Sequence, residues 1–158
     1  MSRYTRTATA LAVTLTAAAA AIPALSGAHT TTATAQVMKF YDKPVTITLT
    51  DPTGHVTSHP PYPQAKPGDV LDVYSLDYAG NHAHHAARWS MSNHLRCTFG
   101  HGAPTCESNV AVGGSLLVFN GNKLVGATGY YQGATGRVLS NKEIPGRDES
   151  DVVLQIKR

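Results

Sequence analysis

The chain has 158 residues, with 13 Lys and Arg against 10 Asp and Glu. Two of the basic residues, Arg3 and Arg6, stand near the N-terminus, so the remainder is almost neutral and has no clustered basic face. This balance argues against a nucleic-acid partner, and the length suits one domain with a single core.

Residues 1–35 have the organisation of a secretory signal peptide. An uncharged, apolar stretch from about Leu11 to Ile22 follows the arginines and is shorter than the roughly 20 residues of a membrane span. Small residues allow cleavage after Ala28 or Ala35, and we favour Ala35. The sequence therefore predicts an extracellular domain, residues 36–158, with no membrane insertion after processing.

Alternation of apolar and polar residues predicts the first β-strands of this domain. In the stretch VTITLT, we expect Val45, Ile47 and Leu49 on one side and three threonines on the other. The proline-rich stretch 58–69 reads as an extended surface connection, because proline has no donor for a sheet ladder. A second strand is expected over 69–79, where β-branched and aromatic residues are frequent.

The segment 88–99 shows the clearest alternation in the chain. Its odd-numbered residues are mainly apolar and its even-numbered residues are polar, so one face should be buried. Downstream, the stretch 109–119 is apolar on both sides, and an Asn-Gly-Asn turn should pair it with 123–129 as a hairpin.

The final predicted strand, 151–157, buries Val152, Leu154 and Ile156 by alternation. No segment of ten or more residues shows the apolar spacing of an amphipathic helix. The sequence therefore predicts an all-β domain of seven or eight short strands, arranged as an antiparallel barrel or sandwich. Closure into a barrel has the advantage that it leaves no exposed edge.

Cys97 and Cys106 are the two cysteines of the chain. In an oxidising compartment such a pair usually forms a disulfide, here closing a loop between two strands. The expected stabilisation is about 2 to 3 kcal/mol. A reactive thiol would need a CxxC pattern or an activating neighbour, and neither is evident.

The glycine-rich segment VGATGYYQGATGRV, residues 125–138, resembles a motif shared by allene oxide cyclases and plant dirigent proteins. The matching positions are Gly129, Tyr131, Gly133, Ala134, Gly136 and Val138. The strand that opens with KPGD and the hairpin SLLVFNGNKLVGATG are similar to their neighbours in those families. The resemblance covers about residues 40–158.

This resemblance implies an eight-stranded antiparallel β-barrel with a central cavity, frequently assembled as a homo-oligomer. Proteins of these families steer the cyclisation or coupling of reactive, mostly apolar molecules and need no cofactor. The catalytic Glu and Asn of the cyclases have no counterpart in VTITLT. The acidic residues inside dirigent barrels are loosely echoed by Asp72 and Asp77.

The glycine-rich segment itself fits a barrel corner. It lacks the Gly-Lys-Ser/Thr ending of a phosphate-binding loop, and it is too short to be a structural repeat. Gly129, Gly133 and Gly136 would allow a tight bend and close approach of strands, with the Tyr131 ring packed against them.

Candidate site residues come from two of the predicted strands. If the barrel encloses a pocket, Trp89 and Met91 would contact a hydrophobic ligand, and Asn93 would orient it. The alternative is that these side chains merely fill a small barrel. Asp72 and Tyr74 share one face of the earlier strand and could transfer protons, although the opposite register would expose both to solvent.

Histidines in the stretch NHAHHA offer a second, weaker site. His82 and His84 would project from the same side of an extended chain, a spacing that Zn²⁺ or Cu²⁺ could use. No carboxylate or cysteine nearby completes such a site, and a solvated His-rich loop is more common. We therefore expect neither a metal nor another cofactor.

The expected function is a secreted barrel that binds a small hydrophobic or aromatic molecule in its lumen. Whether it catalyses a reaction is left open by the sequence; an enzyme of this kind would direct cyclisation, isomerisation or coupling. A carrier, or a protein-binding module that uses the apolar stretch 110–119, are the alternatives. An enzyme should place an ionisable side chain against the lumen, a carrier need not, and a protein-binding module should have a filled barrel.

Overall fold

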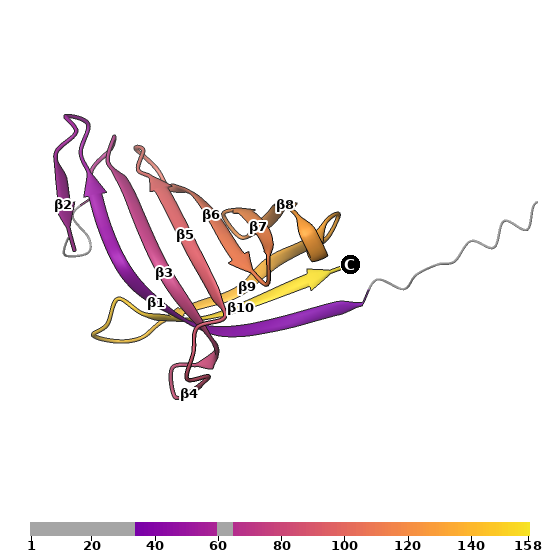
Figure 1. Ribbon diagram of the computed structural model, residues 1–158. Coiled ribbons are helices and arrows are strands. Elements are labelled where there is room, and N and C mark those ends of the chain that lie inside the picture. The colour runs from indigo at the N-terminus through magenta and orange to yellow at the C-terminus, as the bar shows by residue number, and fades with distance from the viewer. Residues whose placement is uncertain (1–33, 60–64) are drawn as a thin grey trace, which may run out of the picture. The chain divides into compact units, whose positions relative to one another are not determined.

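The computed structural model describes residues 34–59 and 65–158 (Figure 1). These residues form ten β-strands and one 3-10 turn, η1 (Gly129–Tyr131). The strands are β1 (Ala35–Thr50), β2 (Val56–Ser58), β3 (Val70–Asn81), β4 (His84–His85), β5 (Met91–Thr98), β6 (Thr105–Val112), β7 (Ser115–Asn120), β8 (Lys123–Ala127), β9 (Thr135–Glu143) and β10 (Ser150–Lys157). Among the described residues, none belongs to a helix that is long and apolar enough to cross a membrane.

Eight of the strands close into an antiparallel barrel. They pair around the ring in the order β1, β10, β9, β8, β7, β6, β5 and β3, and β3 pairs back onto β1. The short strands β2 and β4 add to β1 and β3, as Figure 1 shows. The predicted all-β, eight-stranded antiparallel barrel is confirmed. The predicted signal peptide lies outside the described residues except for its last two positions.

A β-bulge interrupts the pairing of β1 with β3. Pro44 lies opposite Ser75 and Thr46 lies opposite Tyr74, so Val45 has no partner across the ladder. Because proline lacks a backbone N–H, it cannot continue a ladder, and bulges are one of the places where sheets accept it.

The extra residue reverses the alternation along β1. Phe40 and Asp42 are buried on the near side of the bulge, and Ile47 is buried on the far side. Val45, which the sequence pattern grouped with Ile47 and Leu49, is instead 52% exposed. That assignment was wrong because a period of two holds only while every residue takes its place in the ladder.

The apolar stretch 109–119 is two strands and not one. Gly113 and Gly114, with φ of 52° and 76°, make the turn between β6 and β7, a conformation that glycine adopts without strain. The sequence pattern missed this turn because apolar residues continue on both sides of it. The predicted hairpin downstream is present, since β7 pairs with β8 across the turn at Gly121 and Asn122.

Two apolar clusters pack inside the described part of the barrel. The larger consists of Phe40, Met91, Val110, Leu117, Phe119, Leu124, Tyr131, Leu154 and Ile156. The smaller consists of Ile47, Leu71, Val73 and Cys97. Inward-facing residues of every strand in the ring therefore contribute to the interior or pack against it, as the alternation in the final strand predicted for Leu154 and Ile156.

The glycine-rich segment connects β8 to β9. Gly129 and Gly133 have φ of 59° and 76°, in the left-handed region that favours glycine. At Gly136 a Cβ atom would lie 2.5 Å from the carbonyl oxygen of Gln155 on β10, so only glycine allows the two strands this approach. The ring of Tyr131 is 6% exposed and packs in the larger cluster.

Candidate active site in the barrel lumen

A cavity of about 350 Å³ lies between the two apolar clusters. Phe40 and Phe119 line it from the larger cluster, and Val73 lines it from the smaller. The polar residues of its wall are Asp42, Ser75, Asn93, Ser108, Asn122, Asn141 and Ser150. No Lys, Arg or His side chain is part of that wall in the portion of the chain that the structure describes.

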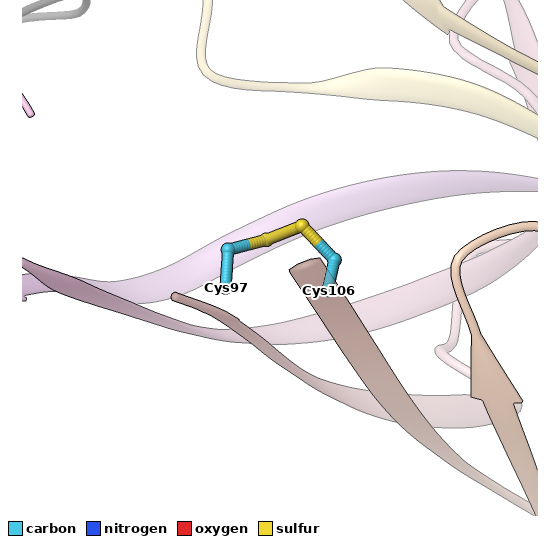
Figure 2. The surroundings of a disulfide bond; sticks show 2 residues. All are labelled: Cys97 and Cys106. Carbon is cyan, nitrogen blue, oxygen red and sulfur yellow. A yellow bond between two sulfur atoms is a disulfide. The ribbon is translucent and has the colours of Figure 1, made fainter. Parts of the chain in front are cut away.

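The Cys97–Cys106 disulfide lies in the wall of this cavity. The two residues stand directly opposite each other on β5 and β6, and their sulfur atoms are 2.07 Å apart (Figure 2). Cys106 lines the cavity, together with Pro104 from the loop that the bridge closes. The predicted disulfide pair is thus present, and it fixes a loop that borders the lumen.

Two buried carboxyl groups face each other beside the lumen. Asp42 on β1 is paired across the ladder with Asp77 on β3, and their side chains are 9% and 0% exposed. Asp42 lines the cavity, and its Oδ1 accepts a hydrogen bond of 3.3 Å from the Ser75 hydroxyl. Neither oxygen of Asp77 has a hydrogen-bond partner among the described residues. Two like charges in this position would be strongly destabilising.

A retained proton relieves this repulsion. Burial, together with the neighbouring charge of Asp42, raises the pKa of Asp77 to about 9. Burial also raises the pKa of Asp42, although its polar neighbours Asp77, Ser75 and Asn93 act in the opposite direction. At neutral pH Asp77 is therefore protonated and can donate a hydrogen bond to Asp42. Asp42 lines the cavity, so it is the member of the pair that can exchange a proton with a bound molecule.

The predicted ligand contacts separate into three environments. Asn93 lines the cavity, and its Oδ1 accepts a 2.7 Å hydrogen bond from the Ser108 hydroxyl. Met91 is 3% exposed and belongs to the larger apolar cluster. Trp89 precedes β5 and is 54% exposed, so the structure does not bring it to the lumen.

The predicted acid–base candidates lie on the outer face of β3. Asp72 Oδ1 is 3.1 Å from His94 Nε2 and 3.6 Å from Arg96 Nη1, and Tyr74 is 44% exposed. The structure therefore does not bring Asp72 or Tyr74 to the cavity. The odd-numbered residues of β3 from 71 to 77, including Ser75 and Asp77, face inward. Asp72 and Tyr74 face outward, which is the alternative that the sequence left open.

The histidines around β4 make contacts with the outside of the barrel. His82 Nδ1 lies 2.6 Å from Asp151 Oδ2, and its backbone N–H donates to the same carboxylate. The ring of His85 packs 4.9 Å from that of Tyr41, between ring centroids. His84 is exposed. Within the described residues, no three His, Cys, Asp or Glu side chains are grouped closely enough to hold a metal ion.

Sequence reasoning missed Asp42, the central residue of the site. The predicted first strand began at Val45, whereas β1 already begins at Ala35. The alternation of Met38, Phe40 and Asp42 was the available signal. However, a charged residue at an inward position, with Pro44 two residues later, is more typical of the end of a strand. Asp77 was noted only through the family resemblance.

Comparisons with family models, with curated proteins and with solved structures gave no match for this chain.

Proposed function

We propose that the barrel binds a small, mainly apolar molecule in its lumen and moves a proton on it, directing an isomerisation or cyclisation. The observation that carries this proposal is the Asp42–Asp77 pair, whose Asp42 carboxyl group stands in the wall of a cavity inside the barrel. Export of the protein is part of the proposal and is supported by the composition of residues 1–35 and by a disulfide, which persists in oxidising compartments.

The cavity and its carboxyl pair favour this function over the two alternatives. A protein-binding module should have a filled barrel, and a lumen of about 350 Å³ speaks against that. A carrier of apolar molecules has no use for two buried carboxyl groups, which cost stability in an apolar interior. Ionisable groups with strongly shifted pKa values in a cavity are typical of active sites.

The proposed chemistry uses a single shared proton. Asp77 keeps its proton, so the pair carries one negative charge, on Asp42. Asp42 then accepts a proton from one atom of the substrate and returns it to another, as a general base followed by a general acid. Isomerisation and intramolecular cyclisation leave the number of protons unchanged, so one group can perform both steps. Ser75 and Asn93 are placed to hold the carboxylate in position.

The experiment starts from the protein isolated with its natural ligand. Native mass spectrometry of the protein from the medium of the producing cells should show a bound small molecule. Incubating that molecule, or its precursor fraction, with purified protein should yield a product isomer. In Asp42→Asn the rate should fall about 10²- to 10⁴-fold, as expected for loss of a proton-transfer group.

Asp72→Asn is the matched control. It removes a carboxylate from the outer face of β3, the strand that pairs with β1, and leaves the lumen unchanged. Its conversion rate should equal that of the unmodified protein. Equal conversion by Asp42→Asn and the unmodified protein would refute the proposed role of the pair, as would a bound molecule that is never converted.

A further inference from the structure

The charges around the lumen are of one sign. Asp42 is the acidic residue of the cavity wall and Asp77 is its buried partner on β3, and no basic side chain lines the cavity in the described part of the chain. The cross-strand partners of Asp42 are Asp77 on β3 and the uncharged Ser150 on β10, and the nearby cavity residue Asn93 on β5 is also uncharged. Glu143, which pairs with Ser150 from β9, is exposed and also acidic.

Among the described residues, no basic side chain in the cavity wall is a counter-ion for the negative charge of the carboxyl pair. Ser75 donates one hydrogen bond to Asp42, and the oxygens of Asp77 have no described partner although the side chain is fully buried. Buried charges are normally paired, because an isolated charge in an apolar interior is costly. A cation that enters the lumen would supply the missing partner.

We infer that the lumen accepts an organic cation, such as a protonated aromatic amine or imine, with the Asp42 carboxylate as its counter-ion. This inference rests on the proposed function, because it names the substrate class of the same lumen. Phe40 and Phe119 supply apolar and aromatic surface for the uncharged part of such a molecule.

The direction of proton transfer gives an independent reason to expect a cationic substrate. When Asp42 takes a proton from a cation, the bond to that proton breaks, its electron pair stays on the substrate, and both partners become neutral. When Asp42 takes a proton from a neutral molecule, the product is an anion, and none of the described residues of the cavity wall has a cationic side chain to stabilise it. In a low-dielectric interior, neutralisation is the favourable direction.

Three ligands of matched shape test this inference: 2-(1-naphthyl)ethylamine, which is cationic at pH 7, the neutral 2-(1-naphthyl)ethanol, and the anionic 1-naphthylacetate. Isothermal titration calorimetry gives the Kd of each. We expect the amine to bind about tenfold more tightly than the alcohol, as for a charge-assisted hydrogen bond in a buried site. The acetate should bind most weakly.

Two further measurements assign the preference to Asp42. Asp42→Asn should bind the amine no better than the alcohol, whereas Asp72→Asn should keep the full preference. In the unmodified protein the preference should disappear at acidic pH as Asp42 gains a proton, because burial raises its pKa. The amine stays charged throughout, so this titration reports on the protein and does not depend on the folding of any variant.

The outcomes separate this inference from the proposed function. Equal or tighter binding of the alcohol or the acetate to the unmodified protein would overturn the inference, even if the natural ligand is converted. A preference for the amine that persists in Asp42→Asn would also overturn it. A preference for the amine that Asp42→Asn abolishes would support the inference, even if the conversion assay refuted the reaction.

Discussion

The carboxyl group of Asp77 has no hydrogen-bond partner among the described residues. Keeping its proton avoids the cost of burying an unpaired negative charge. In the unfolded chain the ordinary pKa is 3.8, whereas in the folded protein burial and the neighbouring charge of Asp42 raise the pKa to about 9. Between these two values the folded state binds a proton that the unfolded state has lost. Stability is therefore greatest below pH 4 as far as this group is concerned and declines as pH rises toward 9.

Asp77→Asn should remove this dependence. Asparagine has nearly the same shape, stays neutral at every pH and can still donate to Asp42. Urea unfolding between pH 5 and pH 8 should show that the unmodified protein loses free energy of unfolding with rising pH, by up to about 1.4 kcal/mol per unit for one proton. The variant should show a flatter profile and should be the more stable protein at pH 8.

Asp72→Asn again serves as the control, since Asp72 lies on the outer face with basic neighbours. It should retain the slope of the unmodified protein between pH 5 and pH 8. Parallel profiles for Asp77→Asn and the unmodified protein would show that Asp77 carries no extra proton in the folded state.

At the scale of elements, the approach of β9 to β10 depends on a single missing side chain. In Gly136→Ala the new Cβ would meet backbone and not a movable side chain, since the carbonyl oxygen of Gln155 lies 2.5 Å away. We expect a loss of about 1 to 3 kcal/mol in the free energy of unfolding, as for other overpacked positions. Chemical denaturation measures it.

Gly102→Ala provides the comparison for that substitution. A Cβ at Gly102 has open space around it, and its backbone is not in the left-handed region. It should leave stability within about 0.5 kcal/mol of the unmodified protein, as is usual for surface positions. If both variants lost the same free energy, the cost would lie in the glycine's flexibility and not in strand approach.

Strands could be predicted from the sequence where one face is apolar and the other is polar. β5 and β10 meet this condition, and their inward residues follow from alternation alone. β9 could not be found this way, because most of its residues are exposed and it shows no apolar face. In the site, Asn93 was predictable because it lies on the same face of β5 as Met91, two residues away. Asp42 was not predicted, because the first strand was expected to begin only at Val45, and the bulge that lets Asp42 and Ile47 both face inward is revealed only by the pairing with β3.

For the whole molecule, the Cys97–Cys106 bridge links the stability of the barrel to access to its lumen. The bridge closes a loop between β5 and β6 that contributes Pro104 to the cavity wall. Replacing both cysteines by serine should lower the free energy of unfolding by about 2 to 3 kcal/mol through loop entropy. Urea unfolding of the double variant measures this loss.

The same variant should exchange lumen ligands faster, because the loop beside the cavity loses its covalent constraint. Stopped-flow measurement of 2-(1-naphthyl)ethanol release tests this, since the alcohol does not depend on the carboxyl pair. An unchanged dissociation rate together with reduced stability would show that the loop does not control entry to the lumen.

At the bulge in β1, the presence of one extra residue matters more than the identity of its side chain. Val45 makes no ladder pair with β3 and is largely exposed, so its side chain can vary freely. Its place in the chain cannot vary, because Asp42 and Ile47 both face the interior only while an extra residue lies between them. The distance in residues from Asp42 to Ile47 is therefore the conserved quantity to look for in related chains, and a one-residue insertion or deletion there would turn either the carboxyl group or the apolar cluster outward.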